Sequence, residues 1–378
     1  MNEYEPPVSD DDLEPVIGSG ARHRTLGRRL AVFAVVCVIA TVGAALYVHR
    51  AAVRADDAGR SSTAHHDTVA GGDKAAPPAV DLTGDLSATL ASPHALVVDT
   101  DSGADFERVT AVPLGQPGGP RSPTELVCER VDYAGGHGVC LVNDRESAQR
   151  RAVLFDAALQ QTGSVSLDGL PSRVRVAPNG KTAAVTTFVV GDAYNIDSFS
   201  TRTIFIDVDR ARATTDLEQF SVERSGRAFH PIDENFWGVT FASDGDTFFA
   251  TMRTGGHYYL IRGSVTARHA EVLRDGVECP ALSPDGTKIA YKSRIEHGFS
   301  SATWQLRVLD VRTLADHALA ETRNVDDQAT WLDSDHVLYA VADERPGGED
   351  VHTWVVPADG TGSPSPFARY AQSPVIVP

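Results

Sequence analysis

The sequence Ser283-Pro284-Asp285-Gly286-Thr287-Lys288-Ile289-Ala290-Tyr291 places an Asp-Gly pair directly before a short apolar run. Such a pair between two apolar runs predicts a β-hairpin, because Asp and Gly accept the backbone angles of a tight turn. Degenerate copies of the phrase recur at 177–185, 242–250 and 332–339, and a looser one covers 133–141. This recurrence indicates a fold built from repeated hairpin units.

The spacing of the turns indicates which repeat it is. The turn residues at 136, 180, 245, 286 and 335 lie 44, 65, 41 and 49 residues apart. Propeller blades of four strands repeat at roughly 40–45 residues, so the long interval needs an insertion. The segments 220–235 and 190–201 supply it. Runs such as Ile204-Phe205-Ile206 follow the turns and favour strands over a helical solenoid.

Five such units fill residues 128 to about 368, and two pieces remain. Ala95–Asp99 and Val109–Pro113 predict the outer half of a further unit, and Gln372–Val377 predicts its inner strand. Joined, they predict a sixth blade closed by strands from both ends of the domain, which leaves no exposed sheet edge. We therefore expect an all-β fold: a six-bladed β-propeller closed by N- and C-terminal strands and preceded by one transmembrane α-helix.

The repeat at 283–291 resembles the Ser-Pro-Asp-Gly-x-x-Ile-Ala-Tyr/Phe core of the TolB-like six-bladed β-propeller family, which has WD40-like repeats. The resemblance covers residues 94–378, and the copy at 283–291 matches most closely. It implies the propeller fold and leaves the function open.

The transmembrane helix is expected at Leu30–Val48, an uncharged and almost wholly apolar run of 19 residues that can span roughly 28 Å. More arginines precede than follow it, which favours a cytoplasmic N-terminus. We interpret it as an uncleaved signal anchor; the alternative is a cleaved signal peptide. We predict that residues 1–29 form a disordered cytoplasmic tail, that residues 49–93 form a flexible stalk, and that residues 94–378 form an extracytoplasmic propeller.

Cysteine placement agrees with export. Cys128 and Cys140 flank the first hairpin symmetrically about Ala134, which predicts a cross-strand disulfide; two buried free thiols are the alternative. Cys279 has no partner in its repeat and is interpreted as a small core residue. Four lysines stand beside thirty arginines, and alanine and valine abound. That composition indicates a high-GC bacterium of actinobacterial type.

The formal net charge is −17, and no basic stripe is present. Nucleic-acid binding is excluded on this ground, because phosphate contacts supply most of that affinity. The sequence also lacks a Gly-x-Ser-x-Gly elbow, a sialidase Asp-box and a His-Glu-x-x-His zinc motif. We expect no cofactor, no metal and no enzymatic activity.

The repeat pattern predicts that loops joining second to third strands share one face with the connectors into the inner strands. These loops are Val190–Thr201, Met252–His257, Ser293–Thr303 and Ala342–Val351. Long loops on a rigid scaffold usually carry function. The binding candidates in the loops are Tyr194, Phe199, His257, His297 and Phe299. The candidates at the channel mouth, each expected just before an inner strand, are Arg173, Glu234, Glu278 and Asp327.

These features predict a non-catalytic protein-interaction or ligand-sensing module at the bacterial cell membrane, with an unidentified protein partner or small ligand. The alternative is a cell-surface hydrolase or lyase with its active site in the central channel. We interpret the four tryptophans, Trp237, Trp304, Trp331 and Trp354, as packing between blades rather than as a ligand cage.

Overall fold

The computed structural model describes residues 80–189, 200–297, 301–342 and 350–378. The chain divides into two units, 1–77 and 78–378, and all described residues belong to the second. The predicted membrane helix at 30–48 lies outside the described residues, as do the predicted tail and most of the stalk. None of the helices that the structure describes is long and apolar enough to cross a membrane.

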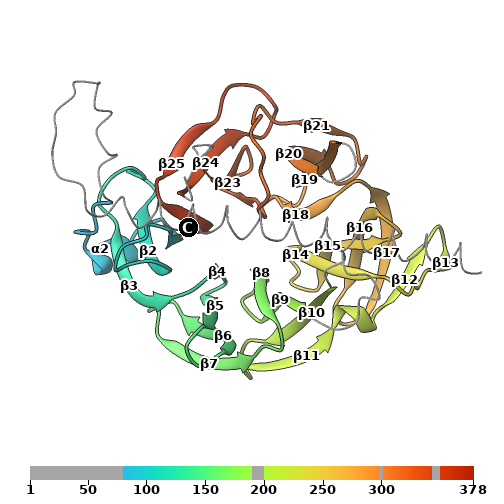
Figure 1. Cartoon of the computed structure of the whole chain (residues 1–378), viewed down its shortest axis with the longest axis horizontal. Coiled ribbons are helices and arrows are strands. Elements are labelled where there is room, and N and C mark those ends of the chain that lie inside the picture. The colour runs from blue at the N-terminus through green and yellow to red at the C-terminus, as the bar shows by residue number, and fades with distance from the viewer. Residues whose placement is uncertain (1–79, 190–199, 298–300, 343–349) are drawn as a thin grey trace, which may run out of the picture. The chain divides into compact units, whose positions relative to one another are not determined.

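The described residues form six sheets around a central axis (Figure 1), so the predicted six-bladed propeller is confirmed. Blade 1 contains β26 (Ala371–Val377), β1 (His94–Asp99), β2 (Arg108–Pro113) and β3 (Ser122–Val127). Blade 2 contains β4 (Arg130–Ala134), β5 (His137–Asp144), β6 (Gln149–Asp156) and β7 (Gln161–Ser166). Blade 3 contains β8 (Leu170–Val176), β9 (Thr182–Val189), β10 (Ser200–Asp207) and β11 (Arg212–Asp216).

The remaining blades follow the same order from the axis outward. Blade 4 contains β14 (Asn235–Phe241), β15 (Thr247–Thr254), β16 (His257–Ser264) and β17 (His269–Asp275). Blade 5 contains β18 (Glu278–Leu282), β19 (Lys288–His297), β20 (Ser301–Asp310) and β21 (Asp316–Ala318). Blade 6 contains β22 (Thr330–Trp331), β23 (His336–Ala342), β24 (Val351–Pro357) and β25 (Ser365–Ala368). Helix α2 (Leu86–Leu90) precedes β1, and Asp85 caps it by accepting from the Ala88 backbone N–H.

Blade 1 is closed by both ends of the propeller, as predicted. The C-terminal strand β26 pairs antiparallel with β1, and Leu96 lies opposite Val375. Both side chains are buried in the same apolar cluster, and a one-residue slip would move them out of that cluster to the opposite face of the sheet. The sequence did not predict β3, whose Pro123 and Glu125 interrupt the apolar pattern of a strand.

The long repeat interval has a structural explanation in blade 4. The predicted insertion forms η1 (Leu217–Gln219), β12 (Ser221–Arg224) and β13 (Arg227–Ala228), and β12 adds to the blade beside β17 in parallel. Phe220 and Val222 bury their side chains against Phe205 and Phe248 of the core. Burial of these apolar groups holds the insertion on the blade.

The repeated turns owe their shape to Asp and Gly. In the clearest copy, Asp285 accepts hydrogen bonds from the Ser283 hydroxyl (2.6 Å) and the Thr287 backbone N–H (3.0 Å). Gly286 has a φ of 72°, which a residue with a Cβ rarely adopts. The turn leads into β19, where Tyr291 is fully buried.

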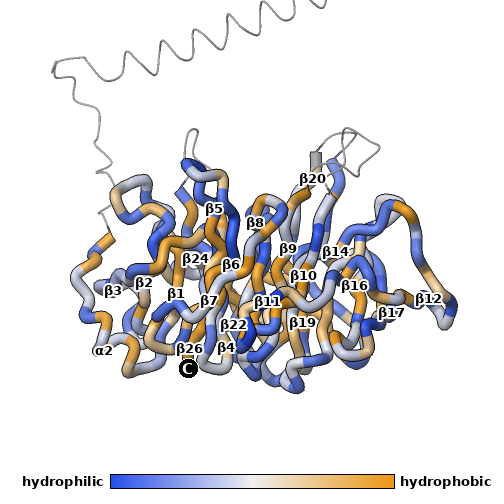
Figure 2. The backbone as a smooth tube through the Cα atoms, turned by 90° about the horizontal axis from the view of Figure 1, so that it is seen from below, coloured by the Kyte–Doolittle hydropathy of each residue, from blue (hydrophilic) through white to orange (hydrophobic). Residues whose placement is uncertain are grey.

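The two faces of the propeller differ. The inner strands begin on one face, here called the loop face, and all except β26 end at the repeated turns on the other, the turn face. Figure 2 shows the loop face at the top, with the C-terminus, which ends β26, at the bottom.

Two of the four predicted long loops are wrong. β15 and β16 continue until only Gly255 and Gly256 join them, because their φ angles of 55° and 80° allow a two-residue hairpin turn. β19 and β20 likewise extend to His297 and Ser301, so most of the predicted loop at 293–303 is strand.

Cys128 and Cys140 form a disulfide with their Cα atoms 5.3 Å apart. They are not a directly opposed cross-strand pair, however. The hairpin turns at Gly135 and Gly136, so Cys140 lies opposite Val131, and Cys128 reaches it from just before β4. Placing the hairpin centre at Ala134 was therefore wrong by more than one residue.

Candidate binding site at the channel mouth

The predicted loop residues do not gather in one site within the described part of the chain. Tyr194, Phe199 and Phe299 lie outside the described residues. His257 begins β16, where its Nδ1 pairs with Asp275 Oδ2 at 2.5 Å and its ring stacks on Tyr259. His297 ends β19 and its Nε2 lies 2.7 Å from the Thr303 hydroxyl. Both histidines lie on paired strands, and neither lines a channel cavity described below.

Three of the four predicted channel residues do come together. Arg173 of β8, Glu278 of β18 and Asp327, which precedes β22, all line cavities in the central channel. Glu234 precedes β14 and lines neither cavity. One of its carboxylate oxygens is buried and has no hydrogen-bond partner among the described residues, and burial raises its pKa.

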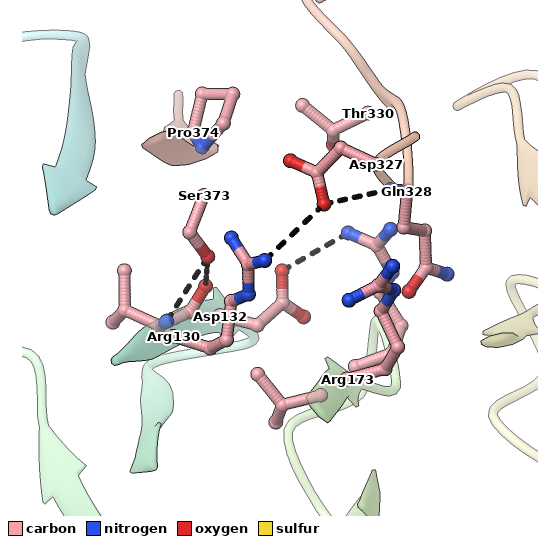
Figure 3. A pocket seen from close by; sticks show the side chains of 11 residues that line it. Arg130, Asp132, Arg173, Asp327, Gln328, Thr330, Ser373 and Pro374 are labelled. Atoms are coloured by element: carbon pink, nitrogen blue, oxygen red, sulfur yellow. Dashed lines mark hydrogen bonds and ion pairs between the residues drawn. The ribbon is translucent and has the colours of Figure 1, made fainter. Parts of the chain in front are cut away.

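The centre of the channel is a small polar cavity of about 30 Å³ (Figure 3). Arg130 Nη2 lies 3.7 Å from Asp327 Oδ1, and Arg175 Nη1 lies 3.1 Å from Asp132 Oδ1. These pairs cross between inner strands of different blades, and their charges balance. A cavity of this size has room for water only, so no organic ligand fits between these paired charges.

A larger cavity opens above it on the loop face and is here called the mouth pocket. Its volume is about 400 Å³, and it spans blades 3, 4 and 5. Its lining residues are Ser172, Arg173, Thr186, Phe188, Thr201, Trp237, Tyr258, Glu278, Cys279, Lys292, Arg294, Trp304 and Asp326. Pockets of about 300–1,000 Å³ with aromatic walls and a few polar groups are typical ligand sites.

Trp304 of β20 is held firmly in one wall of the mouth pocket. Its indole N–H donates to Glu278 Oε1 at 2.9 Å, while the Lys292 ammonium and the Arg294 guanidinium lie 4.9 and 5.3 Å from its ring centroid. Burial raises the pKa of Glu278, although Lys292 and the indole hydrogen bond oppose that shift. The tryptophan, the carboxyl and the two cations thus form one rigid wall.

Arg173 forms the floor, where the mouth pocket meets the polar cavity. It donates from Nη1 to the Ser172 carbonyl at 3.0 Å, and it lies beside the Cys279 thiol. Its Nε is buried without a hydrogen-bond partner, and within the described ranges it makes no ion pair with a carboxylate. Lys292, by contrast, pairs with Asp326, and Arg294 with Glu296.

A bulge in β18 brings two consecutive residues to the pocket. Side chains normally alternate along a strand, but the register shifts between Glu278 and Ala281, and Cys279 has a φ of 49°. Both Glu278 and Cys279 therefore line the cavity. The Cys279 N–H donates to the Thr251 hydroxyl at 2.8 Å, and Gly238 of β14 leaves room for the bulge, since a Cβ there would lie 2.8 Å from Cys279 Cα.

Sequence reasoning missed part of the site. Trp331 is buried in the blade 5–6 core with Trp354 packed against it, in keeping with the predicted packing role. Trp237 and Trp304 line the mouth pocket instead. Lys292 could have been found, because it follows the apolar run Ile289–Tyr291 in a chain with four lysines, and a lysine in a buried strand needs a reason.

Metal binding finds no support in the described residues, which contain no group of three or more His, Cys, Asp or Glu placed to hold a metal ion.

No protein-family model matches the sequence, and no functionally curated protein matches it significantly. Solved structures do resemble the fold. TolB from Acinetobacter baumannii is 16% identical with a TM-score of 0.53, covering 77% of this chain and 67% of that one. A putative TolB from Agrobacterium tumefaciens is 12% identical with a TM-score of 0.47, covering 75% and 91%. A Mycobacterium tuberculosis puromycin-hydrolyzing peptidase is 14% identical with a TM-score of 0.42, covering 73% and 45%.

The chain is therefore a six-bladed propeller with a TolB-like fold. At such identities the likeness concerns the fold alone, and it does not decide between binding and catalysis.

Proposed function

We propose that this protein is a non-catalytic, extracytoplasmic propeller, anchored in the bacterial cell membrane by the helix expected at 30–48, that binds a protein partner through its loop face. The anchor rests on the apolar run and the flanking arginines of the sequence. The binding role rests on the described loop face.

One observation supports this role above the others. All six large apolar side chains that are strongly exposed in the described residues lie on or near the loop face. They are Phe106, Val127, Leu170, Phe188, Ile232 and Ile295. Each lies in a second-to-third-strand connection, at a strand end on that face, or just before an inner strand. They belong to blades 1, 3, 4 and 5, so the exposed apolar surface of the described residues is concentrated on one face, which favours that face for an interaction.

The loop face also contains the mouth pocket, whose rim includes the exposed Phe188. A rigid aromatic pocket within an apolar rim is the arrangement found at interface hot spots, where an anchoring group of the partner is buried. The proposal therefore places the energetic centre of the interface at the channel mouth.

The test is crosslinked co-purification of the full-length protein from its native membranes, with a variant that alters the loop face alone. Ile232→Asp combined with Ile295→Asp adds two charges at exposed positions. Ala157→Asp combined with Ala267→Asp adds the same charges at exposed turns on the turn face. We expect a specific partner that the wild type and the turn-face variant capture and the loop-face variant loses. Equal capture by all three proteins would overturn the proposal.

A further inference from the structure

We infer that the mouth pocket is a binding site for a small molecule, or a terminal group, that joins a ring to a single carboxylate. This inference deepens the proposed function and rests on it for the accessibility of the loop face.

The floor supplies an anion site. Arg173 lines the cavity, its buried Nε has no hydrogen-bond partner in the described residues, and its hydrogen bonds go to the Ser172 carbonyl and hydroxyl and to the Cys279 thiol, none of which is a carboxylate. A guanidinium has five N–H donors in a planar fork that matches a carboxylate in a two-bonded arrangement. Two carboxylates, Asp327 and Asp326, attract Arg173 at longer range, but each is paired with another cation, Asp327 with Arg130 and Asp326 with Lys292.

The walls supply a ring site. Trp237 and Tyr258 meet edge to face at 6.1 Å on the blade 4 side, and Trp304 forms the blade 5 side. Trp304 cannot turn away, because its indole N–H is bonded to Glu278 and two cations lie over its ring. Preorganised aromatic walls favour flat ligands, since stacking needs no rearrangement.

The charge balance selects one negative charge. The ionisable side chains that line the pocket are three cations, Arg173, Lys292 and Arg294, and two carboxyls, Glu278 and Asp326, which leaves an excess of one positive charge. A dianion such as a phosphate monoester would need further cations and would lie near the Glu278 carboxyl, which Coulomb repulsion disfavours. A monocarboxylate matches the single unpaired guanidinium.

The first experiment compares three ligands on the full-length protein by isothermal titration calorimetry. Phenylacetate has a ring and a charge, phenylacetamide keeps the ring without the charge, and acetate keeps the charge without the ring. We expect phenylacetate to bind about tenfold or more tightly than either of the others. Equal binding of phenylacetate and its amide overturns the inference, as does the absence of binding by phenylacetate, indole-3-acetate and cyclohexanecarboxylate at about 5 mM.

A second experiment assigns the site with variants. Arg173→Gln should weaken phenylacetate binding by about 10- to 100-fold while leaving phenylacetamide binding unchanged. Arg262→Gln is the matched control, because Arg262 is exposed on blade 4 and pairs with Glu271 at 2.5 Å. If Arg173→Gln lowers the melting temperature, Arg173→Lys replaces it as the test variant. Lysine retains the positive charge and loses the planar pair of N–H donors, so an intermediate affinity for phenylacetate is expected. Unchanged affinity in a folded Arg173 variant overturns the inference.

The failure of this inference differs from the failure of the proposed function. If no ring carboxylate binds and Arg173→Gln nevertheless abolishes capture of the protein partner, the pocket is part of the protein interface and the small-ligand inference is wrong. If ring carboxylates bind and the loop-face variant captures the partner normally, the inference stands and the proposed protein interface fails.

Discussion

Arg274 of blade 4 and Asp316 of blade 5 form a bridge between neighbouring blades, with Arg274 Nη1 3.0 Å from Asp316 Oδ1. The same carboxylate accepts from the Tyr291 hydroxyl at 2.7 Å and from Arg307 Nε at 2.5 Å. Tyr291 is the last residue of the clearest repeat phrase. The aromatic position of the repeat therefore fills the core and also orients a carboxylate that joins two blades.

This cluster predicts acid sensitivity. Burial alone would raise the pKa of Asp316, but the hydrogen bonds from Tyr291, Arg307 and Arg274 outweigh it and lower the pKa to about 2. In the unfolded chain the carboxyl titrates near its ordinary value of 3.8. Its contribution to stability is therefore complete above about pH 4 and is lost as the pH falls toward 2. We expect about 2 kcal/mol of the free energy of unfolding to disappear over that range.

The measurement is urea unfolding of the wild type and of Asp316→Asn between pH 5 and pH 2. The variant should be less stable at pH 5, and the gap between the two proteins should close as the pH falls. A gap that stays constant with pH would show that Asp316 does not titrate in this way.

A second prediction concerns the charges inside the channel. Arg175 donates to Asp132 at 3.1 Å and to the Ala329 carbonyl at 3.1 Å, so it joins blades 2, 3 and 6. Asp132 is buried, and removing the arginine leaves its carboxylate without a charge partner. Arg175→Ala should therefore cost about 3–5 kcal/mol of unfolding free energy. Arg210→Ala, which breaks an exposed pair with Asp207, should cost less than about 1 kcal/mol. Similar losses in both variants would contradict this view of the channel.

The repeats made most of the fold predictable from the sequence. Asp-Gly turns recur because their φ angles and side-chain hydrogen bonds are local, so each copy can be recognised without knowledge of its neighbours. The closing strand β26 was predicted for a different reason. The C-terminal end of the sequence offers an inner strand without the rest of a blade, and the N-terminal end of the propeller offers further strands of a blade without an inner strand, so the two pieces complete each other. β3 was not predicted because its own residue pattern does not indicate a strand. It is a strand because it pairs with β2.

The site was harder to predict because it depends on geometry that spacing does not encode. Arg173 and Glu278 were found because the inner strands line the channel, but the same reasoning also proposed Glu234, which precedes β14 and lines neither cavity. Trp304 was assigned to packing because its position in the sequence does not show that its ring lines the cavity. In the structure the hydrogen bond to Glu278 holds the ring there. The bulge at Cys279 depends on the glycine at position 238 of the neighbouring blade, which no local pattern reveals.

Glu218 gives a third prediction. It accepts the Thr203 backbone N–H at 2.9 Å, and burial raises its pKa to about 8, against an ordinary value of 4.5. As the pH rises, this carboxyl loses its proton at a lower pH in the unfolded chain than in the folded protein. The wild type therefore loses stability between about pH 4.5 and pH 8. Glu218→Gln keeps an acceptor for Thr203 and removes the titration. We expect the variant to be more stable by about 4 kcal/mol at pH 8 and nearly equal to the wild type at pH 4.5.

Thermal unfolding at the two pH values measures this difference, with Glu223→Gln, at an exposed position of β12, as the control. A stabilisation that is the same at pH 4.5 and pH 8 would indicate that the glutamine packs better and that ionisation of Glu218 has no part in the effect.

The disulfide supports a fourth prediction. Cys128 and Cys140 are separated by 12 positions, and both are buried beside Val131 and Val153 in the cluster that blades 1 and 2 share. A crosslink over a loop of this length restricts the unfolded chain by about 3 kcal/mol in the chain-entropy model. Replacing both cysteines by alanine, or reducing the wild type, should therefore lower the free energy of unfolding by about that amount. The doubly substituted protein should not respond to reductant, because the remaining described cysteine, Cys279, has no disulfide partner in the structure. If reductant destabilises the substituted protein equally, its effect does not pass through this bond, and the closure of the first hairpin must rest on the paired strands β4 and β5 alone.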